Sequence, residues 1–80
     1  MKVLIIEDEA PAARKLEKLL KEIDSTIEVV DVIESVEEGI EWLEENQHPD
    51  VLFSDIQLAD GISFLIFEKV LPKCPIIFTT

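Results

Sequence analysis

The 80-residue sequence has little cysteine and no long hydrophobic run. Its single cysteine, Cys74, has no partner for an internal disulfide, so nothing demands an oxidising compartment. No apolar stretch reaches the length that crosses a membrane, and the N-terminus has too few apolar residues for a signal peptide. We therefore expect a cytoplasmic chain with no membrane partner.

Several kinds of site lack the residues that they need. The two glycines, Gly39 and Gly61, do not form a nucleotide-binding loop. His48 is the one histidine, so a soft-metal site has no second imidazole. Cys74 is followed by Pro75 and apolar residues instead of an anion-binding loop with arginine, which argues against a phosphatase nucleophile.

Basic residues are also scarce. The sequence has 7 lysines and arginines and 18 acidic residues, which gives a net charge of -11. This charge repels nucleic acid phosphates, so no direct nucleic acid contact is expected. The hydrophobic fraction of 48% is that of a globular protein. A chain of this length forms one domain, which buries only about 60% of its unfolded surface and is marginally stable.

Apolar runs and helical periodicities alternate along the chain. We expect strands at residues 2–6, 27–33, 51–55 and 76–80, with helices at residues 12–23, from residue 36 and from residue 62 to about 70. Ser35 and Glu38 form a capping box for the second helix. Right-handed crossovers then give an α/β fold with a parallel sheet and helices on both faces. We expect the strand order 2-1-3-4.

The same patterns predict which side chains are buried. The first helix should bury one stripe, made of Ala13, Leu16, Leu20 and Ile23. The third helix should begin after Asp60-Gly61 and leave Leu65 exposed, while its inner face holds Ser63, Ile66, Phe67 and Val70. Acidic residues within the second strand, Glu28 and Asp31, suit the edge of a sheet.

Two of the predicted strands end in acidic residues. Glu7 and Asp8 follow the first strand, and Asp55 ends the third. In a sheet of order 2-1-3-4, the functional crevice lies beyond the carboxyl ends of strands one and three. Three carboxylates in one crevice must take up protons or share a hard cation, Mg²⁺ first and Mn²⁺ or Ca²⁺ behind it. Because Mg²⁺ combines few protein carboxylates with phosphate oxygens, such a cluster suits phosphoryl chemistry.

The alternative is that these acids merely terminate strands and cap helices, which are frequent roles of aspartate. Two independent apolar strands that both end in acids favour a joint site.

The order and spacing of four segments resemble the receiver domain of bacterial two-component response regulators. These segments are residues 5–9, 51–56, 58–61 and 76–80, and residues 55–61 are most similar to the LytTR class. The resemblance implies a flavodoxin-like three-layer α/β/α fold and a signalling domain rather than an enzyme. It covers residues 1–80 as a partial receiver domain, because the fifth strand with its lysine, the last two helices and the effector domain have no counterpart in the sequence.

The resemblance also implies roles for individual residues. Asp55 is the phosphoacceptor, which takes its phosphoryl group from a sensor histidine kinase. Asp8 and Asp55 are direct Mg²⁺ ligands, as is the backbone carbonyl of Gln57. Glu7, where many relatives have aspartate, acts through a metal-bound water.

At the fourth strand, Thr80 matches the hydroxyl residue that contacts the phosphoryl group, with Thr79 the weaker candidate. Without a fifth strand, residues 76–78 would form a bare apolar edge. We therefore expect a homodimer or a higher assembly through this edge.

Two other functions remain open. One is an inert or self-associating receiver fragment without phosphotransfer, which would keep the same acids. The other is a hydrolase of the haloacid dehalogenase type, which needs a second acid two residues after the nucleophile. Gln57 stands at that position and argues against the hydrolase.

Overall fold

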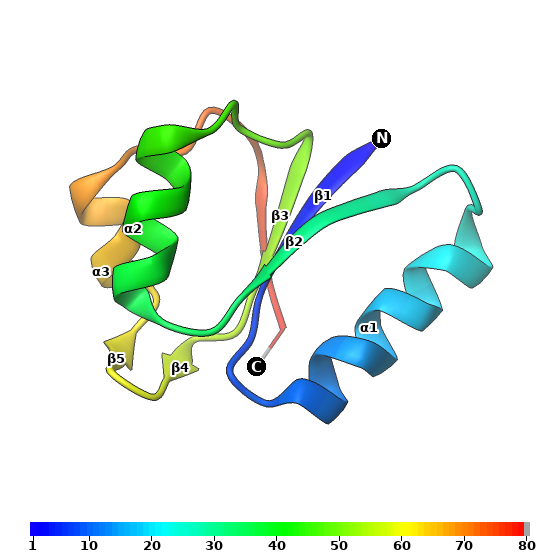
Figure 1. Cartoon of the computed structure of the whole chain (residues 1–80), viewed down its shortest axis with the longest axis horizontal. Helices are drawn as coiled ribbons and strands as arrows, with labels where there is room; N and C mark the ends of the chain where they lie inside the picture. The colour runs from blue at the N-terminus through cyan, green and yellow to red at the C-terminus, as the bar shows by residue number, and fades with distance from the viewer. Residues whose placement is uncertain (80) are drawn as a thin grey trace.

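The computed structural model describes residues 1–79 as a parallel β-sheet with helices on both faces (Figure 1). The elements in chain order are β1 (Lys2–Ile6), α1 (Ala10–Ile23), β2 (Glu28–Ile33), α2 (Val36–Glu45), β3 (Val51–Ser54), β4 (Gln57–Leu58), β5 (Gly61–Ile62), α3 (Phe64–Lys69) and β6 (Ile76–Phe78). The predicted alternation of strands and helices is confirmed, with β4 and β5 added as a short antiparallel hairpin.

The main sheet has the order β2-β1-β3-β6, which confirms the predicted order because β6 is the fourth main strand. All of its pairings are parallel. β1 and β3 lie side by side at the centre, with Val3 opposite Val51 and Ile6 opposite Ser54. Their carboxyl ends are therefore level with each other, so the residues after them are neighbours.

Each face of the sheet has its own apolar cluster. Successive side chains of a strand point to opposite faces, so Val3 and Ile5 pack with Ala13 and Leu20 on the α1 side. Leu4 and Ile6 join the cluster on the other side, which α2 and α3 cover (Figure 1). Residues 3–6 are completely buried, which explains their continuous apolar run. Burial of each such large aliphatic side chain contributes roughly 1.5–3 kcal/mol.

The ends of two predicted elements need correction. Ile23 is 79% exposed and does not belong to the buried stripe of α1. Ile23 is the last residue of α1, and the fold leaves its side chain uncovered although Leu20, three residues earlier, is buried. The fourth main strand ends at Phe78, with Thr79 after it, and Thr80 lies outside the described residues. Glu28 and Asp31 are exposed on the edge strand β2, as predicted.

The third helix begins later than predicted. Asp60-Gly61 does not start it, because Asp60 lies with Ala59 in the turn between β4 and β5 and Gly61 is the first residue of β5. α3 runs from Phe64 to Lys69. Gly61, which follows this turn, has a φ of 144° that other residues rarely adopt. Ser63 and Ile66 are buried and Leu65 is exposed, as predicted.

Two further observations complete the fold. A Cβ atom on Gly39 of α2 would lie 2.6 Å from the Ile66 side chain, so this glycine permits the close approach of α2 and α3. Among residues 1–79, no helix has the length and the apolar character needed to cross a membrane.

Candidate functional site

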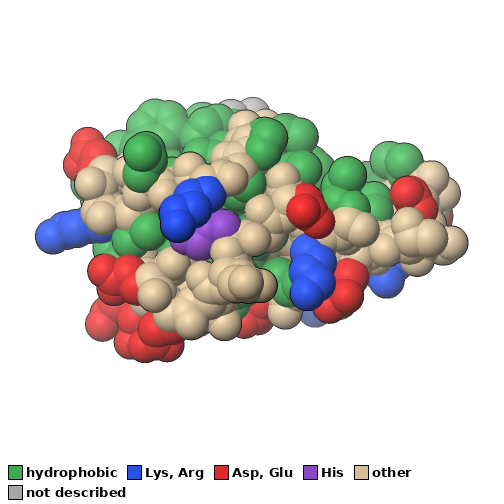
Figure 2. All heavy atoms as spheres, turned by 90° about the horizontal axis from the view of Figure 1, so that it is seen from above, with side chains coloured by type: hydrophobic (Ala, Val, Ile, Leu, Met, Phe, Trp, Pro, Cys, Tyr) green, Lys and Arg blue, Asp and Glu red, His purple; other side chains and the backbone are tan. Residues whose placement is uncertain are grey.

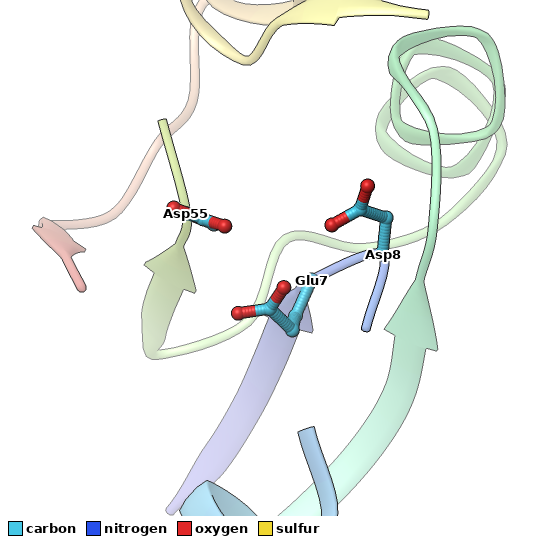
Figure 3. Close-up of side chains that lie close together, drawn as sticks. All are labelled: Glu7, Asp8 and Asp55. Atoms are coloured by element: carbon cyan, nitrogen blue, oxygen red, sulfur yellow. The ribbon is translucent and has the colours of Figure 1, made fainter. Parts of the chain in front are cut away.

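The three predicted acidic residues meet at the carboxyl end of the sheet. Glu7 and Asp8 follow β1, and Asp55 follows β3. One carboxylate oxygen from each lies within 4.8 Å of the others, and the three side chains converge on one space (Figure 3). All three are partly buried. Their convergence, which the strand ends predicted, is therefore present in the fold.

Backbone hydrogen bonds hold these residues in place. The Asp55 N–H donates to the carbonyl of Ile6 over 2.9 Å, and the Glu7 N–H donates to the carbonyl of Ile33 over 2.8 Å. The Ser54 hydroxyl, which is completely buried, donates to the Asp55 carbonyl over 2.8 Å. The hydrogen bonds of the sheet therefore extend into the site and fix the backbone positions of Glu7 and Asp55.

The carboxylates have few compensating donors. One oxygen of Asp55 accepts the N–H of Ile56 over 2.8 Å, and a Glu7 oxygen accepts the N–H of Glu9 over 3.2 Å. Burial raises the pKa of Glu7, and the nearby charges of Asp55 and Asp8 act in the same direction, against the Glu9 hydrogen bond. Three crowded oxygen ligands form a donor set that fits a hard divalent cation such as Mg²⁺.

The remaining predicted site residues lie around this cluster. Gln57 begins β4, two residues after Asp55, and its use as a carbonyl ligand stays a prediction. The Thr79 N–H donates to the carbonyl of Ser54 over 2.9 Å, which places Thr79 beside the end of β3. Thr80, the predicted phosphoryl contact, lies outside the described residues.

Asp60 has a role that the sequence did not reveal. Its carboxylate accepts the N–H groups of Val36 over 2.8 Å and Glu37 over 3.2 Å, so it caps α2 instead of α3. The Val36 hydrogen bond is the main cause that lowers the pKa of Asp60. No local pattern signals this contact, because the two segments are 24 residues apart.

Known proteins resemble this chain in sequence and in fold. The family model of the response regulator receiver domain matches residues 3–80. The sensory transduction protein LytT of Bacillus anthracis is 36% identical over 83 residues, which cover 100% of this chain and 33% of that protein. LytR of Staphylococcus haemolyticus is 41% identical over 70 residues, or 88% of this chain and 27% of that protein.

Among solved structures, the response regulator PhyR from Brucella abortus aligns with a TM-score of 0.81 and 30% identity. The alignment covers 96% of this chain and 32% of that one. The chain spans about a third of the length of the curated relatives that it matches. The LytT relatives support the link to the LytTR class. Since the family model spans residues 3–80, the chain belongs to the family of response regulator receiver domains.

Proposed function

We propose that this receiver domain is a phosphoacceptor and that Asp55 takes a phosphoryl group from a phosphohistidine of a sensor histidine kinase. The observation that carries the proposal is the meeting of the Glu7, Asp8 and Asp55 oxygens within 4.8 Å. Like charges at this distance repel each other. A bound divalent cation would offset this repulsion and could also bind the oxygens of a phosphoryl group. Family membership supports the same function.

In the proposed reaction, a carboxylate oxygen of Asp55 attacks the phosphorus atom of the phosphohistidine. A P–O bond forms, the P–N bond breaks, and the histidine nitrogen keeps the electron pair and takes up a proton from water. Asp55 becomes an acyl phosphate. The backbone hydrogen bond from Asp55 to Ile6 holds the nucleophile at the strand end during this step.

The remaining site residues position the cofactor and the phosphoryl group. Asp8, Asp55 and the Gln57 carbonyl would hold Mg²⁺ directly, and Glu7 would hold it through a water. When bound, Mg²⁺ offsets the negative charge of the phosphoryl oxygens. The hydroxyl of Thr80 is proposed to bond one of these oxygens.

Phosphorylation by a small acyl phosphate in the presence of Mg²⁺ tests the proposal. Intact mass measurement should show the addition of one phosphoryl group, which Asp55→Asn abolishes. Asp31→Asn is the matched control, because Asp31 is exposed on β2 and its bond from the Val32 N–H needs only one side-chain oxygen. A wild-type chain that gains no mass, or an Asp55→Asn chain that still does, contradicts the proposal.

A second candidate function, self-association, is favoured by the apolar side chains at the β6 edge. Ile77 is 47% exposed and Phe78 is 41% exposed. The ring of Phe78 packs edge to face against that of Phe64 at 5.2 Å, and Phe64 is itself 43% exposed. Hydrophobic side chains gather along the upper side of the molecule in Figure 2. An exposed apolar strand edge recruits other chains.

Light scattering tests this second function. We expect a mass above that of the monomer, which Ile77→Glu returns to the monomer value. Leu71→Glu is the control, because Leu71 is 81% exposed but lies outside β6. A monomeric wild-type chain at working concentration would falsify the idea.

A further inference from the structure

The N-terminus of α2 has two side-chain caps that come from different parts of the chain. Ser35, the residue before the helix, accepts the N–H of Glu38 over 3.1 Å. Asp60 accepts the N–H groups of Val36 and Glu37 from a turn that is more than 20 residues away. Because the first N–H groups of a helix have no partner within it, both side chains accept hydrogen bonds from groups that would otherwise be unpaired. Only Asp60 ties the helix to another element.

The turn that carries Asp60 belongs to the segment that leaves the acidic site. The hairpin pairs Gln57 with Ile62 and Leu58 with Gly61. At its base, the Ser63 N–H donates to the carbonyl of Ile56 over 2.8 Å. Ile56 is the residue after Asp55, and its own N–H donates to the Asp55 carboxylate. The hairpin therefore follows directly after the proposed phosphoacceptor, and its tip is hydrogen-bonded to α2.

The hairpin is held at few points. Its base is closed by the Ile56–Ser63 bond, Leu58 is buried in the core, and its tip is bonded to α2 through Asp60. A two-residue antiparallel pair has little stability of its own. Loss of the Asp60 bonds would free the tip and loosen residues 55–58, which include two of the proposed metal ligands, Asp55 and Gln57.

We propose that Asp60 is a positioning residue that couples the acidic site to the N-terminus of α2. This inference rests on the proposed function, because Asp60 would hold the Asp55–Gln57 segment in the position that binds Mg²⁺. The coupling is reciprocal, since a ligand that is bound more tightly when a contact is formed must strengthen that contact. Mg²⁺ at the acidic site thus stabilises the first turn of α2.

Four versions of the chain separate positioning from simple helix capping: wild type, Asp60→Ala, Asp60→Asn and Ser35→Ala. Mg²⁺ affinity is measured for each by calorimetry. Asp60→Ala should weaken Mg²⁺ binding roughly tenfold, the lower end of the loss seen when groups that orient metal ligands are removed. Asp60→Asn should recover part of the affinity, because its amide oxygen can still accept the Val36 N–H. Ser35→Ala removes a cap from the same helix and should leave the affinity unchanged.

Amide hydrogen exchange at Val36 and Glu37 supplies a readout apart from activity. In the wild-type chain Mg²⁺ should slow the exchange of both N–H groups, and in Asp60→Ala this slowing should disappear. If the wild type binds Mg²⁺ and Asp60→Ala binds it equally well, the coupling is disproved while the proposed function stands. Equal weakening by Ser35→Ala would show that helix stability alone is responsible. A wild-type chain that binds no Mg²⁺ overturns the proposed function itself.

Discussion

At the carboxyl end of the sheet three acidic side chains crowd into one space, whereas at the amino end the side chains of Asp50 and His48 are hydrogen-bonded to backbone groups. There the Lys2 N–H donates to the Asp50 carboxylate over 2.7 Å, and the Asp50 N–H donates to the Lys2 carbonyl over 2.8 Å. The Lys73 N–H donates to Nδ1 of His48 over 3.0 Å. Nε2 of His48 therefore carries the proton and donates to the carbonyl of Leu43, also over 3.0 Å.

The two ends of the sheet therefore differ in how their polar side chains are compensated. The amino end, which Figure 2 views from above, joins the end of α2, the start of β3 and the segment before β6. A hollow of about 510 Å³ lies at this end beside Trp42 and Lys2, away from the acidic cluster. The three carboxylates of the candidate site crowd together at the carboxyl end, as expected where a binding site limits stability.

Among the substitutions that test the difference between the two ends, Asp8→Asn should have the largest effect, which is the loss of Mg²⁺ binding at the carboxyl end. It removes a proposed metal ligand, so Mg²⁺ should no longer bind at millimolar concentration. In the wild type, Mg²⁺ at ten times its Kd should stabilise the fold by about 1.4 kcal/mol, and in the variant this gain should vanish. Urea unfolding with and without Mg²⁺ measures both. Glu41→Gln, an exposed acid on α2, should keep the gain. A persistent gain in Asp8→Asn would remove Asp8 from the site.

His48→Ala tests the paired end. The carbonyl of Leu43 and the N–H of Lys73 both lose their partner, and we expect a loss of about 2 kcal/mol in the free energy of unfolding. Mg²⁺ affinity should stay unchanged, because the acids lie at the other end of the strands. The control is Gln47→Ala at the neighbouring exposed residue, which should change the free energy of unfolding only slightly. Weaker Mg²⁺ binding in His48→Ala would show that the two ends are coupled.

Two buried serines near the carboxyl end provide an internal comparison. Ser54 and Ser63 are both completely buried, and the Ser54 hydroxyl donates to the Asp55 carbonyl. The hydroxyl of Ser63 has no hydrogen-bond partner among the described residues. Ser63→Ala should therefore raise the free energy of unfolding by about 1 kcal/mol, while Ser54→Ala should lower it by a similar amount. Equal effects of the two substitutions in urea unfolding would contradict this assignment.

Glu7→Gln should have the smallest effect and a characteristic pH dependence. The pKa of Glu7 in the folded chain is raised above its ordinary value of 4.5, so the folded state holds this proton more tightly than the unfolded state. Glu7 therefore lowers stability as the pH rises from 4.5 through the folded pKa, and the full penalty is present at neutral pH. Glu7→Gln should remove this penalty and make the variant slightly more stable at neutral pH.

The control for Glu7→Gln comes from acids that shift the other way. Hydrogen bonds lower the pKa values of Asp24 and Asp60 below 3.8, so their stabilisation is present above 3.8 and is lost as the pH falls through the lowered values. The Glu7 effect should therefore separate from theirs in unfolding curves recorded on either side of pH 4.5. An unchanged pH profile in Glu7→Gln would mean that the pKa of Glu7 is not raised in the folded chain.

Much of the carboxyl end could be predicted because its geometry follows from short-range patterns. Apolar runs of strand length that end in Glu7 and Asp55 indicate two buried parallel strands, and parallel strands bring such ends to one edge. The edge position of β2 follows from Glu28 and Asp31 in the same way. Boundaries were less certain, as the exposed Ile23 and the late start of α3 show.

The alternation of the main strands and helices and the acids at the ends of β1 and β3 follow from the sequence alone. These features depend on periodicity and on short-range order along the chain, and parallel strands then bring the three acids to one edge. By contrast, the capping of α2 by Asp60 and the link that His48 makes between Leu43 and the segment before β6 depend on the packed fold. Such contacts form between side chains and backbone groups far apart in the chain, and their partners are set by how the packed elements happen to approach each other.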